Sequence, residues 1–143
     1  MSARTLSILG VTGSIGQSTI RVIEEMRAQG AELEVEAITA GGNIPALVDA
    51  CQRLRPRFAA IADAGLLNGA REALSGLGVA VGAGPTALEE AGARPADWVM
   101  SAIVGAAGLA PTMAAVRRGA VVALANKECL VCAGPLFIAA AKA

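Results

Sequence analysis

Thr5-Leu-Ser-Ile-Leu-Gly-Val-Thr-Gly-Ser-Ile-Gly-Gln-Ser-Thr-Ile20 joins a short apolar run to three spaced glycines and then to a helix-like segment. A strand, a glycine turn and a helix start in this order suit a pyrophosphate, because free amides and the positive end of the helix dipole face the anion. The glycines are Gly10, Gly13 and Gly16, and Thr12 stands where the more usual fingerprint has its middle glycine. A simple glycine-rich turn is the alternative. The position directly after a buried-type strand favours nucleotide binding.

Strands and helices alternate along the whole chain with short connections. We expect strands at 5–9, 33–39, 58–62, 79–81, 97–103 and 121–125. We expect helices at 14–28, 45–54, 64–77, 85–90 and 108–118, and from 126 to the C-terminus with an interruption at Gly134-Pro135. Such alternation is typical of a mostly parallel sheet with helices on both faces. The prediction is one Rossmann-like α/β domain over residues 1–143, whose first helix has an apolar stripe of Ile15, Thr19, Ile20, Val22, Ile23 and Met26.

Composition excludes several classes of function. The chain has 55% hydrophobic residues and a formal net charge of zero, and its basic residues are scattered, which disfavours nucleic-acid binding. An uncharged run at 98–116 contains Gly105, Gly108 and Pro111, so it fits a strand and a helix better than a membrane span. We therefore expect a cytoplasmic protein without a membrane partner. Histidine and tyrosine are absent, which excludes Ser-His-Asp and Cys-His catalysis, His-based metal sites and Tyr or His proton donors for hydride transfer.

Four strand-to-helix loops, at 10–16, 40–43, 102–108 and 125–128, should open on one edge of the sheet. The second loop indicates whether the site prefers NAD or NADP. An NAD site usually has an acid after the second strand, and the sequence here is Thr39-Ala-Gly-Gly-Asn43. Absence of that carboxylate removes a repulsion against a 2′-phosphate and favours NADP, although the loop has no Arg or Lys to hold the phosphate.

The fourth loop places an amide, an ammonium and a carboxylate in succession at Asn126, Lys127 and Glu128. Lys127 is one of only two lysines in the chain, which points to a role at a site. In the alternative interpretation, Asn126 is a helix N-cap and the two charged side chains are solvated in the first turn.

Together the four loops resemble those of one family. The segments Gly10-Val-Thr-Gly-Ser-Ile-Gly16, Ala40-Gly-Gly-Asn43, Ser101-Ala-Ile-Val-Gly-Ala-Ala-Gly-Leu109 and Leu124-Ala-Asn-Lys-Glu-Cys-Leu-Val131 follow one another in that family's order. The chain resembles the N-terminal NADPH-binding domain of 1-deoxy-D-xylulose 5-phosphate reductoisomerase, an enzyme of the non-mevalonate isoprenoid pathway. The similarity runs over all 143 residues and would cover about the first third of such an enzyme.

The resemblance implies a role for each loop. Thr12, Gly13, Ser14 and Ile15 would surround the cofactor diphosphate, and Gly41, Gly42 and Asn43 would lie at the adenosine ribose and its 2′-phosphate. Asn126 and Glu128 would approach the nicotinamide end, and Lys127 would bind the sugar phosphate substrate. The family converts 1-deoxy-D-xylulose 5-phosphate to 2-C-methyl-D-erythritol 4-phosphate with NADPH and Mg or Mn. Its metal ligands, its remaining substrate-binding residues and its C-terminal domain come after the point where this chain stops.

This resemblance leads to further expectations and leaves alternatives. The chain alone should bind NADPH without turnover, should hold no metal, and belongs to an enzyme with a possible homodimer. The family often has Lys or Arg before the loop asparagine, and Gly42 stands there instead. Cys129 and Cys132 form a C-x-x-C, for which a redox or zinc role is less favoured than packed thiols. The other readings are a non-enzymatic dinucleotide-sensing domain and the cofactor domain of a semialdehyde dehydrogenase, which the Asn-Lys-Glu loop does not suit.

Overall fold

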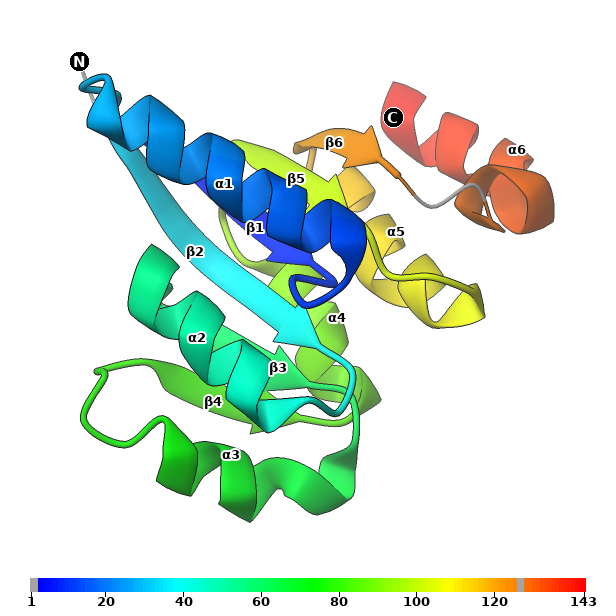
Figure 1. Cartoon of the computed structure of the whole chain (residues 1–143). Helices are drawn as coiled ribbons and strands as arrows, with labels where there is room; N and C mark the ends of the chain where they lie inside the picture. Colours follow the sequence, from blue (N-terminus) through cyan, green and yellow to red (C-terminus); the bar gives the residue numbers. More distant parts are fainter. Residues whose placement is uncertain (1–2, 126–127) are drawn as a thin grey trace.

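The computed structural model describes residues 3–125 and 128–143, with the side chains of 128–133 outside the description (Figure 1). The strands are β1 (Arg4–Leu9), β2 (Leu33–Ala40), β3 (Phe58–Ile61), β4 (Ala80–Ala83), β5 (Trp98–Ser101) and β6 (Val121–Leu124). The α-helices are α1 (Ser14–Ala28), α2 (Ile44–Leu54), α3 (Leu67–Ala73), α4 (Pro85–Ala93), α5 (Leu109–Arg117) and α6 (Glu128–Lys142). Two short 3-10 turns, η1 (Ala64–Leu66) and η2 (Ala106–Gly108), precede α3 and α5.

The six strands form one sheet in the order β4-β3-β2-β1-β5-β6, and every neighbouring pair is parallel. The chain first moves outward from β1 through β2 and β3 to β4. It then crosses back to β5 on the other side of β1 and continues to β6. This reversal beside β1 is the strand pattern of doubly wound nucleotide-binding folds. The predicted Rossmann-like α/β class is confirmed.

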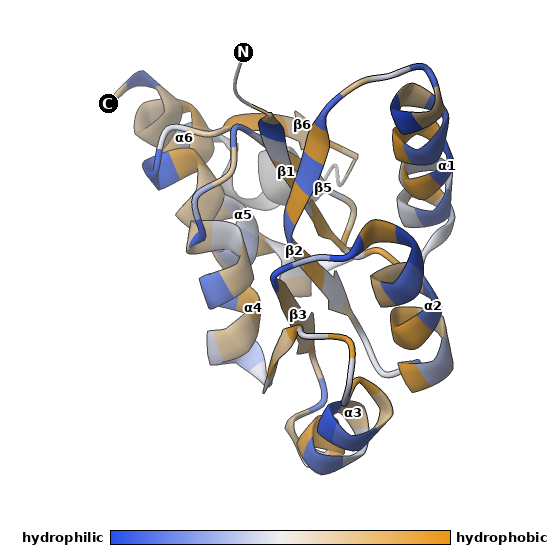
Figure 2. Ribbon diagram, turned by 90° about the vertical axis from the view of Figure 1, so that its left-hand side faces the viewer, coloured by the Kyte–Doolittle hydropathy of each residue, from blue (hydrophilic) through white to orange (hydrophobic). Residues whose placement is uncertain are grey.

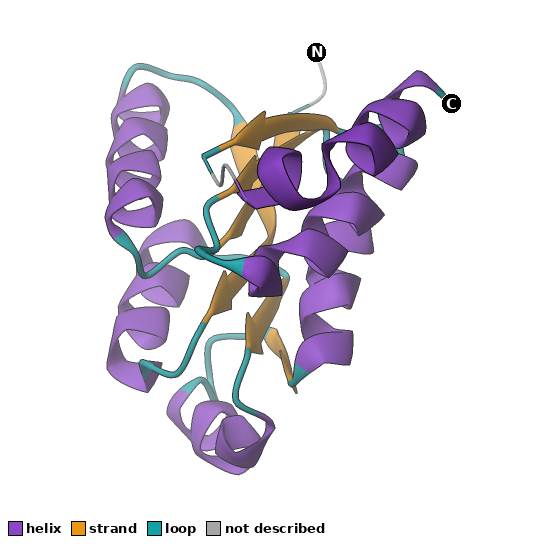
Figure 3. Cartoon of the chain, turned by 90° about the vertical axis from the view of Figure 1, so that its right-hand side faces the viewer, coloured by secondary structure: helices purple, strands orange, loops and turns teal. Residues whose placement is uncertain are grey.

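Helices cover the sheet on both faces, as Figures 2 and 3 show. The first face has α1 and α2, with α3 beside α2 at the β4 edge, and the second face has α4, α5 and α6. Two apolar clusters fill the spaces between the layers. The first includes Ile8, Ile20, Ile38 and Leu47 under α1 and α2, and the second includes Leu9, Val99, Leu88 and Ala115 under α4 and α5. None of the helices in the described part of the chain is long and apolar enough to span a membrane.

The first helix faces the sheet with a narrower stripe than the sequence indicates. Gly16, Ile20 and Ile23 are its buried residues. Ile15, Val22 and Met26 are 46%, 55% and 42% exposed, so the wider predicted stripe is wrong at these positions. Two of these residues, Val22 and Met26, line an open groove between α1 and strands β1 and β5, so they are not covered by the sheet.

Two predicted helices differ from the observed ones. The helix expected at 64–77 is a 3-10 turn followed by the short α3, because the chain must turn back after Ala73 to enter β4 at the sheet edge. The interruption expected at Gly134-Pro135 is absent, and α6 continues through Pro135. Proline inside a helix removes one backbone hydrogen bond. Packing of α6 against α5 compensates, and it buries Phe137 to 4% exposure.

A glycine contact sets the spacing of α4 and α5 on the second face. Gly92 is buried in α4, and a Cβ atom there would collide with the backbone carbonyl oxygen of Pro111 in α5. The obstacle is backbone, so it cannot rotate away as a side chain would. The two helices can therefore pack this closely only while residue 92 has no side chain.

We expect Gly92→Ala to lower the free energy of unfolding by roughly 3 kcal/mol, since α4 and α5 would have to move apart. Urea denaturation followed by far-UV circular dichroism measures this change. Gly134→Ala is the matched control, because no atom lies within 4 Å of the added Cβ in α6. The control should remain within about 1 kcal/mol of the parent protein. Equal stability of the two variants would contradict the proposed packing constraint.

Candidate functional site

The carboxyl ends of the six parallel strands meet at one edge of the sheet. The loops after β1, β2 and β5 open at this edge, as expected from the sequence (Figure 1). The strand order reverses between β2-β1 and β5, so the loops after β1 and β5 leave the sheet in opposite directions. In open α/β sheets, a ligand binds in the crevice outside this reversal. The edge beside β1 and β5 is therefore the candidate site.

Thr39 at the end of β2 fixes the turn after β1. The amide of Gly10 donates to Thr39 Oγ1 at 2.8 Å, and the amide of Val11 donates to the Thr39 carbonyl oxygen at 2.8 Å. The side-chain amide of Gln17 donates to the Val11 carbonyl at 3.2 Å. Thr39 is 1% exposed, so its hydroxyl has little access to water as an alternative partner. The turn is thus attached to β2 on one side and to α1 on the other.

Two glycines of the motif allow close backbone contacts. Gly10 has a φ of +88°, and a Cβ there would lie 2.7 Å from the Ala102 carbonyl oxygen in the loop after β5. A Cβ at Gly16 would overlap the Gly10 carbonyl oxygen and the Val11 backbone. Gly16 therefore lets α1 begin directly against the turn, and Gly10 lets the turn touch the β5 loop.

The N-terminus of α1 has the properties of an anion site. Gly13 is its N-cap, and no side chain in the described part of the chain caps the helix. The first turn contains no acidic residue, so nothing there neutralises the positive end of the dipole. Gly13, Ser14 and Ile15 are exposed, and Thr12 is half-buried. The first helical amides, which have no partner inside a helix, can bind an anion that approaches from solvent.

The loop after β2 is exposed at Gly41, Gly42 and Asn43. The side-chain oxygen of Asn43 accepts a hydrogen bond from the Ala46 amide at 3.1 Å and so caps α2. The side-chain NH2 group of Asn43 is then the part of this residue that can donate to a ligand. A Cβ at Gly42 would meet only the Leu66 side chain, at 3.7 Å.

The remaining predicted residues lie at the far side of the reversal. The Ala125 amide donates to the Ser101 carbonyl at 2.9 Å, which places the end of β6 at the same edge. Asn126 and Lys127 lie outside the described residues, as does the side chain of Glu128. The structure thus brings 12–15 and 41–43 to one edge, and the roles expected for 126–128 stay predictions.

Sequence reasoning missed two residues of this edge. The sequence indicates only that Thr39 ends a strand, because its hydroxyl contact with Gly10 depends on the pairing of β2 with β1. Asp63 follows β3, and its amide donates to the Gly41 carbonyl at 3.3 Å. A signal was available for Asp63, since an acid directly after a predicted strand lies at the ligand edge of a parallel sheet.

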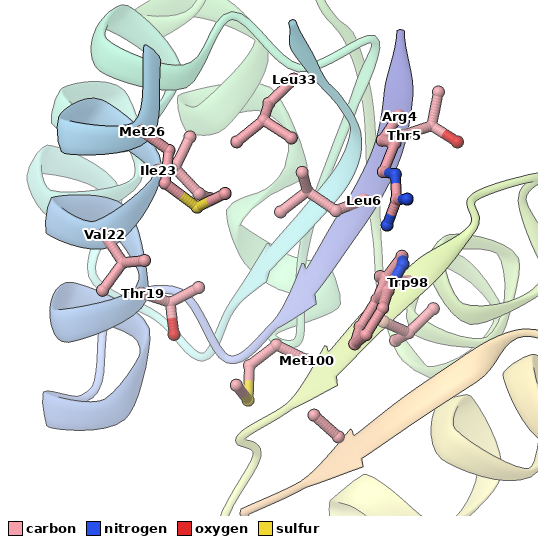
Figure 4. A pocket seen from close by; sticks show the side chains of 12 residues that line it. Arg4, Thr5, Leu6, Thr19, Val22, Ile23, Met26, Leu33, Trp98 and Met100 are labelled. Carbon is pink, nitrogen blue, oxygen red and sulfur yellow. The ribbon is translucent and has the colours of Figure 1, made fainter. Parts of the chain in front are cut away.

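An apolar groove of about 300 Å³ lies elsewhere, between α1, the amino-terminal half of β1, and β5 (Figure 4). Leu6, Val22, Met26, Trp98 and Met100 are among the side chains that line it. The lining is mostly apolar, and the side chains in it that can donate a hydrogen bond belong to Arg4, Thr5, Thr19 and Trp98, none of which lies in the β1–α1 turn. The groove shares no lining residue with the turn at 10–16 or the loop at 41–43 and is therefore separate from the candidate site in position.

Cys51 is a buried free cysteine in α2. Burial raises the pKa of its thiol to about 12, so it remains protonated at neutral pH and is a poor nucleophile or metal ligand. Cys129 and Cys132 belong to the residues whose side chains are outside the description. Among the described residues, no group of three or more Cys, Asp or Glu side chains is placed to hold a metal ion.

Comparisons with known proteins agree with this geometry. The family model of 1-deoxy-D-xylulose 5-phosphate reductoisomerase matches residues 6–134. Reductoisomerases of this name from Bradyrhizobium sp. BTAi1 and Caulobacter vibrioides are 53% identical over 135 residues and 54% identical over 142 residues. These matches cover 94% and 99% of this chain, and 32% and 35% of the relatives. The chain thus spans about a third of the length of these relatives.

Two solved structures are similar over nearly the whole chain. The reductoisomerase of Zymomonas mobilis in complex with NADPH has a TM-score of 0.94 and 49% identity, covering 99% of this chain and 37% of that one. A reductoisomerase in complex with NADPH, fosmidomycin and magnesium has a TM-score of 0.88 and 34% identity, covering 97% of this chain and 34% of that one.

We expect Thr39→Val to lower the free energy of unfolding by about 1–3 kcal/mol, because the Gly10 amide loses its acceptor in a site poorly reached by water. Amide hydrogen exchange by NMR should show faster exchange at Gly10. Thr39→Ser is the control, since it keeps the hydroxyl and should keep the Gly10 amide protected. If Val and Ser protect the amide equally, the hydroxyl does not anchor the turn.

Proposed function

The chain belongs to the 1-deoxy-D-xylulose 5-phosphate reductoisomerase family, and we propose that it forms the NADPH-binding portion of such an enzyme. One observation carries the proposal: the uncapped N-terminus of α1 opens at the strand reversal, where the loops after β1 and β5 touch. This is where a dinucleotide diphosphate binds in open α/β folds. The TM-score of 0.94 to a reductoisomerase complexed with NADPH supports the same choice of cofactor.

We assign the diphosphate to the turn at Thr12, Gly13, Ser14 and Ile15, where backbone amides and the α1 dipole favour negative charge. The adenosine ribose and its 2′-phosphate would lie at Gly41, Gly42 and Asn43. Asn43 can donate from its side-chain NH2 group while its oxygen caps α2. With no cationic side chain in this loop, backbone amides at the start of α2 would face the 2′-phosphate.

The reaction we propose for the whole enzyme converts 1-deoxy-D-xylulose 5-phosphate to 2-C-methyl-D-erythritol 4-phosphate in isoprenoid biosynthesis by the non-mevalonate route. Bound NADPH would supply the hydride. Asn126 and Glu128 would orient its nicotinamide end, and Lys127 would bind the substrate phosphate. The ligands for Mg or Mn would come from the rest of the enzyme, which we propose to be a cytoplasmic homodimer.

Titration calorimetry with NADPH and NADH tests the binding role of this chain. We expect saturable NADPH binding by the chain and no turnover of 1-deoxy-D-xylulose 5-phosphate with Mg²⁺. Gly16→Ala should weaken NADPH binding at least about tenfold, because the added methyl group forces α1 away from the turn. Gly134→Ala, in α6, should bind as the parent protein does. Undiminished affinity in Gly16→Ala would contradict the proposed diphosphate site, and turnover by this chain would contradict the division of roles.

Gly42 offers a second test, directed at the 2′-phosphate. The position has room for a side chain, so Gly42→Arg should be tolerated. An exposed charge-assisted contact contributes about 1 kcal/mol, so the preference for NADPH over NADH should rise about fivefold. Ala28→Arg adds the same charge at the exposed end of α1 and should leave the preference unchanged. An unchanged ratio of the two dissociation constants in Gly42→Arg would place the 2′-phosphate elsewhere.

A further inference from the structure

The end of β3 is the part of the ligand edge that lies beyond the ribose loop. If the diphosphate binds at the start of α1 and the ribose binds after β2, the dinucleotide runs from β1 towards β2, and the adenine base at its end would lie over the next strand in the sheet. That strand is β3, which pairs with β2 in parallel register from Ala37 and Phe58 to Ala40 and Ile61. This step depends on the proposed function, since it takes the direction of the bound dinucleotide from it.

The loops after β2 and β3 are joined by backbone hydrogen bonds. The Ala62 amide donates to the carbonyl oxygens of Ala40 at 2.9 Å and Gly41 at 3.1 Å. The Asp63 amide donates to the same Gly41 carbonyl at 3.3 Å. The half-buried Leu66 approaches Gly42 from the 3-10 turn η1. A group that follows the ribose loop outward therefore meets residues 62–66.

Asp63 carries the side-chain polar group of this segment. Its neighbours Ala62, Ala64, Gly65 and Leu66 have no side chain that can make a hydrogen bond. One carboxylate oxygen, Oδ1, accepts from the Gly65 amide at 2.9 Å, which fixes the orientation of the carboxylate. Asp63 is exposed and takes part in none of the ion pairs found between described residues. Its second oxygen, Oδ2, is thus an oriented acceptor at the ligand edge.

We propose that Asp63 recognises the exocyclic amine of the cofactor adenine through Oδ2. The amine has two donors, and a carboxylate is an acceptor-only group, so the pair is complementary. The neighbouring Leu66 offers apolar contact to the plane of the base. A base with an oxo group in place of the amine would direct lone pairs at the carboxylate and would be rejected.

The variant Asp63→Asn tests this contact with little change of shape. Only the amide oxygen of Asn can accept from the Gly65 amide, so the NH2 group must occupy the place of Oδ2. The acceptor for the base then becomes a donor. The matched probe is the hypoxanthine analogue of NADPH, in which an oxo group replaces the adenine amine. Asp49→Asn, which removes the same charge from the exposed side of α2, is the control.

Calorimetry should show that the parent protein binds NADPH about tenfold more tightly than the hypoxanthine analogue. Asp63→Asn should reverse that preference, and Asp49→Asn should keep it. Equal affinity of the parent protein for the two cofactors would overturn the proposal, and this measurement does not depend on how well the variant folds. A uniform loss of affinity in Asp63→Asn would also overturn it, since a ribose contact or a general loss of structure affects both cofactors alike.

If the proposed NADPH-binding function is itself wrong, the same calorimetry gives a different result. If the parent protein binds neither NADPH nor its hypoxanthine analogue, the proposed cofactor site is wrong, and the assignment of Asp63 fails with it. If both are bound without discrimination, the cofactor site stands and only the role of Asp63 is rejected.

Discussion

The attachment of the β1–α1 turn to Thr39 is the constraint on which the ligand edge depends. Two hydrogen bonds of 2.8 Å connect the turn to the end of β2, one through the Thr39 hydroxyl and one through its carbonyl. Gly16 then brings α1 against the turn, and Gly10 brings the turn against the loop after β5. Because each contact is made by backbone or by a buried hydroxyl, the helix amides are held in place before any ligand arrives. Such preorganisation lowers the ordering cost of binding.

The charged side chains of the described ion pairs lie away from this edge. Glu36 on β2 is almost fully buried and accepts hydrogen bonds from Arg57, before β3, and from Arg94, after α4. Both arginines stand at the amino ends of the strands. A buried carboxylate needs such partners, because an unpaired one would be strongly destabilising. At the opposite edge, the turn at 10–16 has backbone amides and uncharged side chains, so the dipole of α1 is the electrostatic feature that an anion meets at this turn.

Those features of the fold that depend on local sequence pattern could be predicted from the sequence. Alternating strands and helices predicted the class of fold, and the loops at 10–16 and 40–43 were correctly placed on one edge. The hydroxyl contact of Thr39 and the bond from the Asp63 amide to Gly41 could not be predicted, because they depend on the pairing of strands that are far apart in sequence. The position of Asp63 at the ligand edge could have been predicted, because this acid directly follows a predicted strand. The interruption predicted at Pro135 is wrong for the converse reason: local propensity favours a break, whereas α6 packs against α5 as an unbroken helix with Phe137 buried.

The two loops to which we assign the adenosine end differ in the ligand groups that they could distinguish. The loop after β2 is neutral, and its one polar side chain already uses its oxygen to cap α2. It can bind a phosphate through amides, but amides distinguish a phosphate from a hydroxyl less strongly than a cationic side chain does. The segment after β3 carries an oriented carboxylate fixed by the Gly65 amide. A carboxylate attracts a hydrogen-bond donor and repels the lone pairs of an acceptor, so a contact of this kind discriminates sharply between bases. If the proposed cofactor site is right, the base would therefore provide the stronger basis for selectivity at the adenosine end, and the 2′-phosphate the weaker one.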